Sequence, residues 1–307
     1  MMTSIPSRMK QNNTEQEINR TGKTIKLKDG RTLGYAEYGS FQGEPVFEFH
    51  GNPSSRLGSK LLDEAAKRLD IRVIGIDRPG MGLSSYKPGR KLIDWPEDVI
   101  ELANVLEIDR FAILGGSGGV PATLATAYKI PDRLTGVGVL FGPRPLDKPN
   151  ATHGWSRPRR FQAFLGRKGP LWIGTLALKS VARSMLRKPD EAISRMFRGL
   201  PESDKAVLAI PSVKQMYIDS IQEAFLSGTR GVALDYALTV RPWGFKLEDI
   251  SIDVHLWHGE EDHVVPPVMG HYLAETMPNC TALFLQNEGH FSLLPNHVEE
   301  ILKSFVS

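Results

Sequence analysis

Short, nearly continuous apolar segments recur along the first half of the chain, and each ends in turn residues. Residues 45–51, 71–80, 110–117 and 134–142 have this pattern. Strands of a parallel sheet covered by helices on both faces are apolar throughout, because neither face meets water. Segments with helical spacing, such as residues 92–108, separate them. The pattern therefore predicts an α/β fold with a mostly parallel sheet and helices on both faces.

Two regions depart from this alternation. Residues 24–39 alternate apolar and polar positions on either side of Asp29-Gly30, which predicts an antiparallel hairpin. Residues 143–240 are punctuated by Arg and Pro and contain amphipathic helical segments, and the alternation resumes after them. This second region predicts a helical insertion after the sixth strand of the sheet.

The chain divides accordingly. Residues 1–22 are polar, unpatterned and without the apolar core of a secretory signal, so we expect them to be disordered. We assign residues 23–142 and 241–307 to the α/β core and residues 143–240 to the helical insertion. The length of 307 residues fits one large domain that carries an insertion.

Composition excludes several classes of protein. The chain is 41% hydrophobic with a formal net charge of +3, which is too small to indicate a nucleic-acid partner. No apolar run approaches the roughly 20 residues that a transmembrane helix needs. The single cysteine, Cys280, excludes an intramolecular disulfide and a cysteine-built metal site. We therefore expect a cytoplasmic protein, and we interpret Cys280 as a packing residue at the start of a strand.

Positive charge is concentrated in the insertion. From Arg144 to Arg241 the chain has 17 Lys and Arg residues against 8 Asp and Glu. We interpret this excess as the solvated surface of the helices; the alternative is a basic surface that faces anionic substrates or lipid headgroups. The large apolar residues of the insertion offer material for an acyl pocket, and we interpret them as its core. They are Trp155, Phe161, Phe164, Trp172, Met185, Met196, Phe197, Met216, Tyr217 and Phe225.

One serine, Ser117, stands between glycines in the segment AILGGSGG, residues 112–119. A sharp strand-to-helix turn exposes a serine hydroxyl for attack but crowds the positions two before and two after it, here Gly115 and Gly119. The turn also places the Gly118 amide at a helix N-terminus, where it can donate to a developing oxyanion. The pattern alone also fits a serine N-cap. The strand before it, the helix after it and the partners downstream favour the nucleophile.

Two partners follow Ser117 in the order that such a site needs. Asp262 lies in the loop after a buried strand and can orient a histidine, with Glu260 and Glu261 as the alternatives. His290 follows the next strand, behind a glycine and before an apolar helix start. Nucleophile, acid and base then lie on three strand ends at one edge of the sheet. The competing interpretations are a solvated acidic loop and a structural histidine.

A third component is the segment FHGNPSSR, residues 49–56. Gly51 lets the backbone approach the site, and the amide of Asn52 is placed to be a second oxyanion donor beside Gly118. We expect His50 to hold this loop by a hydrogen bond rather than to perform acid–base chemistry.

The sequence resembles the α/β-hydrolase superfamily in its cap-bearing branch of small esterase-like enzymes. The resemblance covers residues 23–307 and rests on HGNP, DRPGMGLS, GGSGG, HGEEDHVVP and EGHF, in the family's order and spacing. It implies an eight-stranded, mostly parallel sheet with an antiparallel second strand, and a cap that corresponds to residues 143–240. The site residues it implies are a triad of Ser117, His290 and Asp262, with backbone oxyanion donors at Asn52 and Gly118.

The predicted function is a serine hydrolase that cleaves a carboxylic ester or related acyl bond through an acyl-enzyme. We expect a small-molecule acyl substrate and neither a metal nor an organic cofactor. One alternative keeps the triad but acts on a lactone, thioester, amide or carbon–carbon bond; another is a ligand receptor on this fold with little turnover. A serine at position 117 argues against the family's aspartate-dependent dehalogenases and epoxide hydrolases, and the absence of HGGPG argues against a proline iminopeptidase. The last strand and helix offer an edge for a homodimer.

One acidic residue conflicts with the predicted burial. Glu48 lies inside a strand that we expect to be buried on both faces. A buried carboxylate needs a partner, and we predict an ion pair with Arg56 or Arg78. A role of Glu48 in substrate binding is the alternative.

Overall fold

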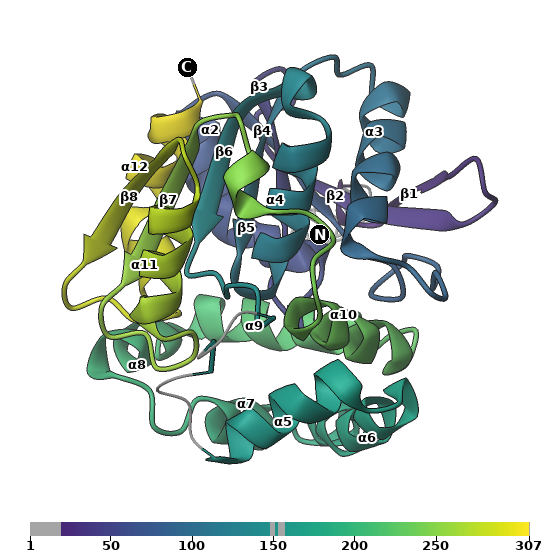
Figure 1. The fold of residues 1–307 in the computed structure, drawn as a ribbon, viewed down its shortest axis with the longest axis vertical. Coiled ribbons are helices and arrows are strands. Elements are labelled where there is room, and N and C mark those ends of the chain that lie inside the picture. The colour runs from purple at the N-terminus through teal and green to yellow at the C-terminus, as the bar shows by residue number, and fades with distance from the viewer. Residues whose placement is uncertain (1–19, 148–150, 153–156, 307) are drawn as a thin grey trace, which may run out of the picture.

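The computed structural model describes residues 20–147, 151–152 and 157–306. A sheet is covered by helices on both faces, and a further group of helices lies together beyond the end of the sheet at which its parallel strands end (Figure 1). The segment predicted to be disordered, residues 1–22, lies outside the described residues except for residues 20–22. There the Thr21 carbonyl accepts a hydrogen bond from Arg56 Nε at 2.5 Å.

The sheet of the described residues has eight strands in the order β1-β2-β4-β3-β5-β6-β7-β8. β2 runs antiparallel to both of its neighbours, and the other pairs are parallel. The predicted eight-stranded sheet with an antiparallel second strand is therefore confirmed. The bounds are β1 Lys23–Lys26, β2 Thr32–Gly39, β3 Glu44–Phe49, β4 Ile71–Ile76, β5 Phe111–Gly116, β6 Leu134–Leu140, β7 Val254–Gly259 and β8 Cys280–Leu285.

Helices cover both faces because the central strands carry apolar side chains on each. The larger core joins one face to α3 (Trp95–Val105), α4 (Val120–Lys129) and α11 (Pro267–Thr276), and the smaller core joins the other face to α2 (Asp63–Arg68) and α12 (Leu293–Phe305). Phe47 of β3 and Phe111 of β5 stack in the larger core with ring centroids 4.4 Å apart. This two-sided packing holds the carboxyl ends of β3, β5, β7 and β8 as one rigid edge.

Six described helices lie between β6 and β7, all inside residues 143–240. They are α5 Arg157–Lys168, α6 Leu171–Arg187, α7 Pro189–Met196, α8 Glu202–Leu208, α9 Pro211–Ala224 and α10 Arg230–Val240. α9 packs against the core's 3-10 turn at Arg56–Leu62, whereas α5 and α6 pack against α10. In Figure 1, α5 and α6 lie farther from the sheet than α9 and α10 do.

Our interpretation of the insertion's apolar residues as core needs correction. Phe161, Phe164, Trp172 and Met196 are exposed, whereas Met185, Met216 and Phe225 are buried as predicted. Helical spacing shows that apolar residues share a face, but it does not show whether another helix covers that face. Trp155 lies outside the described residues.

Candidate active site

Ser117 lies in the turn between β5 and α4, at the carboxyl end of a central strand. A short 3-10 turn covers Ser117–Gly119. Ser117 has a φ of +52°, in the left-handed region that costs a residue with a side chain about 1–2 kcal/mol. The surrounding packing holds the serine in this strained conformation, a feature that clusters at functional sites.

The glycines flanking Ser117 are explained by close packing. A Cβ added at Gly115 would collide with Oγ1 of Thr123, and one added at Gly119 would collide with the carbonyl oxygen of Phe49. Thr123 and Phe49 both belong to packed elements of the core, so neither can move away without disturbing the sheet. The two positions therefore exclude any side chain.

The structure brings Ser117, His290 and Asp262 together from distant parts of the sequence. His290 Nε2 lies 3.0 Å from Ser117 Oγ, and His290 Nδ1 lies 2.7 Å from Asp262 Oδ2. Asp262 Oδ1 accepts hydrogen bonds from the amides of Val264 and Val265, both at 2.7 Å. Asp262 is 2% exposed and His290 is 4% exposed. In such an arrangement a carboxylate can orient an imidazole, whose other nitrogen can accept the proton of the hydroxyl.

Asp262, rather than Glu260, contacts the His290 ring. Glu260, one of the alternative acids, instead faces His271 on α11 at 3.6 Å. His258, at the end of β7, was not among the predicted site residues; its Nε2 lies 2.8 Å from the Val265 carbonyl oxygen and 3.6 Å from Asp262 Oδ2. Burial lowers the pKa of His258, so the neutral ring donates from Nε2 to that carbonyl and supports the loop.

The loop after β3 contacts the turn that carries the serine. A Cβ added at Gly118 would lie 2.8 Å from Asn52 Cβ and 3.1 Å from the Asn52 amide nitrogen. His50 Nδ1 lies 2.7 Å from the Gly51 carbonyl oxygen, and the Arg78 amide donates to His50 Nε2 at 3.3 Å. Burial, assisted by Arg78, holds the pKa of His50 well below its usual range, so the ring is neutral. Both ring nitrogens of His50 hold the loop.

A buried ionic group on α10 supports the same loop. Asp235 lies 2.7 Å from Arg78 and 2.5 Å from Arg90, and it accepts a hydrogen bond from Asn52 Nδ2 at 3.1 Å. The Tyr236 hydroxyl donates to the Asn52 carbonyl at 2.7 Å. Burial alone would raise the pKa of Asp235, but the two arginines outweigh it and lower that pKa well below its ordinary value. Our sequence reasoning missed this group, although Asp235 is the only charged residue within 231–240.

A second buried carboxylate reaches the histidine from α8. Asp204 is fully buried and accepts hydrogen bonds from the amides of His290 at 3.1 Å, Phe291 at 2.8 Å and Ser292 at 2.9 Å. These three amides form the loop that presents the His290 ring. The sequence carried no local signal for this contact, because Asp204 lies in an ordinary polar helix start 86 residues before His290.

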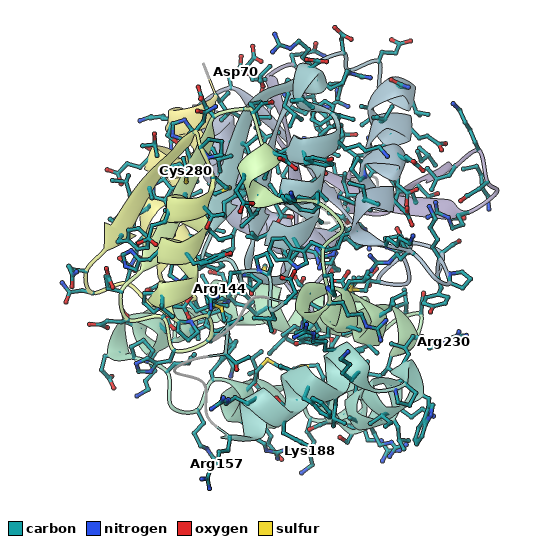
Figure 2. All side chains as sticks on the ribbon, in the orientation of Figure 1. Asp70, Arg144, Arg157, Lys188, Arg230 and Cys280 are labelled. Atoms are coloured by element: carbon teal, nitrogen blue, oxygen red, sulfur yellow. The ribbon has the colours of Figure 1, made fainter. Side chains whose placement is uncertain are left out.

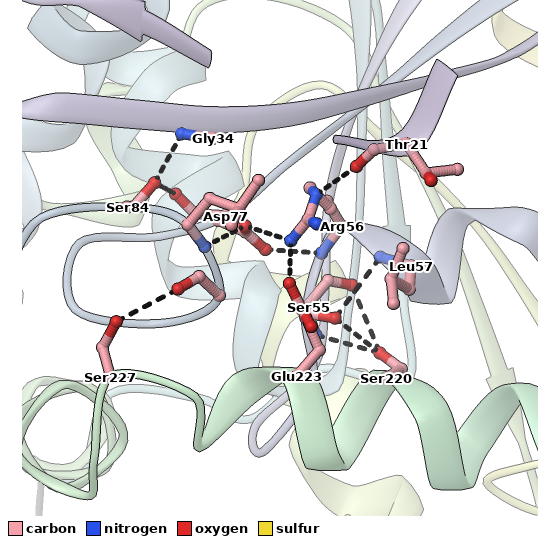
Figure 3. A network of polar contacts seen from close by, with 12 residues as sticks. Thr21, Gly34, Ser55, Arg56, Leu57, Asp77, Ser84, Ser220, Glu223 and Ser227 are labelled. Atoms are coloured by element: carbon pink, nitrogen blue, oxygen red, sulfur yellow. Dashed lines mark hydrogen bonds and ion pairs between the residues drawn. The ribbon is translucent and has the colours of Figure 1, made fainter. Parts of the chain in front are cut away.

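α9 makes a third buried connection, shown in Figure 3. Arg56 Nη1 lies 2.7 Å from both Asp77 Oδ2 of the core and Glu223 Oε1 of α9. Ser220 Oγ, also on α9, accepts a hydrogen bond at 3.0 Å from the amide of Ser55, in the loop that follows β3. Three helices of the insertion thus supply polar groups that hold the two loops beside Ser117.

Aromatic rings line the approach to the histidine. His290 contacts Phe141 and Phe291, with ring centroids 4.6 Å and 5.0 Å away. Phe291 in turn contacts Phe197 and Tyr217 of the insertion, at 4.7 Å and 5.4 Å. Phe197 also lines a surface cavity of about 550 Å³ between α7, α8 and α9. Aromatic rings therefore border the histidine beside its polar partners Asp262 and Ser117.

The predicted ion pair of Glu48 with Arg56 or Arg78 is wrong. Glu48 Oε2 accepts a hydrogen bond from Ser59 Oγ at 2.7 Å. Both arginines form their short ion pairs with other carboxylates, Asp77 and Glu223 for Arg56 and Asp235 for Arg78. Burial without a directly paired cation raises the pKa of Glu48 to about 7.

This raised pKa predicts a pH dependence of stability. The folded chain binds the Glu48 proton more tightly than the unfolded chain, so the free energy of unfolding falls as the pH rises from about 4.5 to about 7. A Glu48→Gln variant should lose this component. Urea unfolding at pH 5 and pH 8 measures it, with Glu44→Gln, an exposed position on the same strand, as the control. An unchanged difference between the two pH values in Glu48→Gln would contradict the assignment.

Within the part of the chain that the structure describes, no helix is both long and apolar enough to span a bilayer. Among the same described residues, no three His, Cys, Asp or Glu side chains gather as metal ligands would.

Comparisons with known proteins agree with this architecture. A proline iminopeptidase of Xanthomonas citri is 33% identical to this chain over 112 residues. These residues are 34% of this chain and 34% of that enzyme, so the chain matches only about a third of the length of the iminopeptidase. The uncharacterized hydrolase YcgS of Bacillus subtilis is 23% identical over 286 residues, 89% of this chain and 93% of that protein. The structure of a thermophilic esterase from Thermogutta terrifontis aligns with a TM-score of 0.60 and 24% identity, over 93% of this chain and 99% of that one.

A model of the alpha/beta hydrolase family matches residues 49–303. This match begins at the end of β3 and extends into α12, so it contains every residue of the candidate site. The eight strands and the antiparallel β2 are those expected from the resemblance of the sequence. The chain therefore belongs to the alpha/beta hydrolase family.

Proposed function

We propose that this hydrolase cleaves a carboxylic ester or a related acyl bond, with Ser117 as the nucleophile and an acyl-enzyme as the intermediate. The observation that carries the proposal is the continuous set of contacts from Ser117 Oγ through His290 to Asp262. Ser117 lies at the carboxyl edge of the sheet, on a strained turn between a strand and a helix, where such nucleophiles are found in this fold.

Acylation follows from the positions of these groups. His290 Nε2 accepts the hydroxyl proton as Ser117 Oγ attacks the substrate carbonyl carbon, and Asp262 stabilises the imidazolium that forms. The amides of Asn52 and Gly118 donate to the oxygen that becomes negative. When the tetrahedral intermediate collapses, His290 gives the proton to the departing alcohol.

Deacylation repeats these steps with water. His290 accepts a proton from a water molecule that attacks the acyl-enzyme, and the same two amides hold the second oxyanion. His290 then returns the proton to Ser117 Oγ as the carboxylic acid leaves. Every proton moves through His290, and the chain's own residues suffice for the cycle.

We further propose that residues 143–240 form a cap that closes the site and shapes its acyl pocket. Phe197 and Tyr217 of this region contact Phe291, which contacts the His290 ring. An apolar acyl group placed against these rings would be removed from water. This placement favours esters with an apolar acyl chain.

Amide cleavage is the alternative that the iminopeptidase relative raises. An enzyme that recognises a free amino terminus needs a carboxylate that faces the substrate's ammonium group. The insertion brings three carboxylates to the loops beside Ser117, and each already has partners: backbone amides for Asp204, Arg56 for Glu223, and Arg78 and Arg90 for Asp235. The geometry therefore favours the ester.

Steady-state hydrolysis of p-nitrophenyl esters with short to long acyl chains tests the proposal. We expect many turnovers per enzyme, with a preferred chain length that reports the size of the pocket. Prolyl p-nitroanilide in the same assay should be cleaved at least 100-fold less efficiently. A single burst that stalls would instead favour a ligand receptor on this fold, and preferred cleavage of the anilide would favour the peptidase.

A further inference from the structure

The outer helices of the insertion expose large apolar side chains. The exposed fractions are 61% for Phe161, 59% for Phe164, 64% for Trp172, 58% for Leu176 and 58% for Leu186. Single exposed apolar residues are normal, but a group of five on two consecutive helices indicates an interaction surface. The proposed hydrolytic reaction uses none of them.

These residues form one stripe on each of the two helices. On α6 the outward positions 172, 176, 179, 183 and 186 are three or four residues apart, which places them on one side of the helix. On α5 the outward positions 157, 161, 164 and 168 repeat the same spacing. The opposite sides pack inward: Ala163 of α5 lies in a cluster with Val240 of α10, and Ala182 and Met185 of α6 lie in a cluster with residues of α9 and α10. We call the two stripes together the outer cap face.

The charged residues of α5 and α6 are all positive. Between residues 148 and 189 the sequence contains ten Lys and Arg residues and no Asp or Glu. Six of these cations are exposed on α5 and α6 themselves: Arg157, Arg160, Lys168, Lys179, Arg183 and Arg187. Figure 2 shows Arg157 and Lys188 at the end of the molecule that lies away from the sheet. Aromatic and aliphatic side chains thus alternate with cations on the outer cap face.

We propose that the outer cap face docks on the surface of an anionic lipid bilayer. Helices that lie in the interface of a membrane combine Trp, Phe and Leu with Lys and Arg, because the rings enter the headgroup region while the cations meet the lipid phosphates. A second copy of the chain would place six exposed cations against six others, so charge repulsion opposes self-association through this face. Docking leaves the helices intact at the surface and requires no spanning segment.

The four tryptophans of the described residues make the docking directly measurable. Trp95, Trp243 and Trp257 are buried, whereas Trp172 is exposed on the outer cap face. Vesicles that contain 30% phosphatidylglycerol in phosphatidylcholine should therefore shift the Trp emission to the blue and sediment with the protein. Pure phosphatidylcholine vesicles should bind at least tenfold less protein, and 0.5 M NaCl should release most of it. In a Trp155→Phe background, which removes the fifth tryptophan of the chain, Trp172→Phe should lose the spectral shift while retaining most of the binding.

Charge-reversal variants distinguish docking through the outer cap face from nonspecific adsorption to vesicles. The double variant Lys179→Glu/Arg183→Glu should weaken binding to the anionic vesicles at least 20-fold, since each cation near such a surface contributes roughly fivefold. The matched control, Lys28→Glu/Lys246→Glu, makes the same change at exposed positions of the core and should bind within threefold of the unchanged protein. All proteins should hydrolyse a soluble ester equally, and repeating the sedimentation with Ser117→Ala makes the result independent of turnover.

Three results would overturn the proposal. One is equal binding to neutral and anionic vesicles, and another is binding that Lys179→Glu/Arg183→Glu does not weaken. The third is the absence of vesicle binding together with a concentration-dependent dimer, in analytical ultracentrifugation, that Phe161→Ala/Phe164→Ala dissociates. That last outcome would assign the outer cap face to a second copy of the chain.

Discussion

Ser117→Ala is expected to lower kcat for p-nitrophenyl ester hydrolysis by about 10⁴- to 10⁶-fold. The variant retains the backbone turn and loses the nucleophile together with its contact to His290 Nε2. Loss of one partly buried hydrogen bond costs about 1 kcal/mol, so the midpoint of thermal unfolding should fall by no more than roughly 2–4 °C. Steady-state kinetics and a thermal melt on the same preparation measure both quantities.

A matched control shows whether the effect belongs to this hydroxyl. Ser227 Oγ donates to the Gly82 carbonyl at 3.1 Å and lies outside the proposed machinery, so Ser227→Ala should retain kcat within twofold. A covalent fluorophosphonate probe should label the unchanged protein once and should not label Ser117→Ala. Retention of more than about one hundredth of kcat in Ser117→Ala would contradict Ser117 as the nucleophile.

The second large effect is expected at Asp204, a residue that touches no substrate in the proposed reaction. Asp204→Ala leaves three amides of the His290 loop without this acceptor, two of them in buried hydrogen bonds, and each unpaired buried amide costs about 1–3 kcal/mol. Asp204→Asn is the more informative variant, because one oxygen remains to accept from these amides. Displacement of a reacting group by about 1 Å can cost roughly 100-fold. We therefore expect Asp204→Asn to lower kcat by about 10- to 100-fold with little change in KM.

The measurement must separate positioning from loss of folded protein. Counting active sites with the fluorophosphonate probe gives kcat per folded and labelled enzyme, which partial unfolding does not lower. Glu202→Gln, at an exposed position in the first turn of the same helix, is the control and should keep kcat within twofold. Unchanged kcat per labelled site in Asp204→Asn would reduce Asp204 to a structural role.

Asp204, Glu223 and Asp235 share a feature that explains why the insertion matters to the core. They come from three successive helices, α8, α9 and α10, and each reaches a loop beside Ser117. Buried carboxylates that satisfy amides or arginines are costly to separate, because the groups left behind remain unpaired. These helices therefore act as a fixed support for the two loops, while α5 and α6 form an outer layer with its own surface.

The sequence was most informative where the physical signal is local. Apolar runs of strand length indicated the sheet, and Asp29-Gly30 indicated the hairpin, because burial and turn conformation depend on a few neighbouring residues. The same holds for Ser117: the glycines at 115 and 119 reflect collisions within one strand-turn-helix unit. Order along the chain then sufficed to propose Asp262 and His290, since parallel strands place their carboxyl ends at one edge.

Only the tertiary structure decided which charged groups meet and which helix faces are covered. Glu48 was assigned to Arg56 or Arg78 by proximity in sequence, yet other carboxylates hold both arginines and Ser59 meets Glu48. Asp235 reaches Arg78 across 157 positions, and no local pattern encodes such a separation. In the same way, helical spacing grouped Phe161 with Phe164 but did not show that their side of α5 stays exposed. Pairing and exposure depend on where whole elements pack, and that is settled by the burial of the entire core rather than by any segment alone.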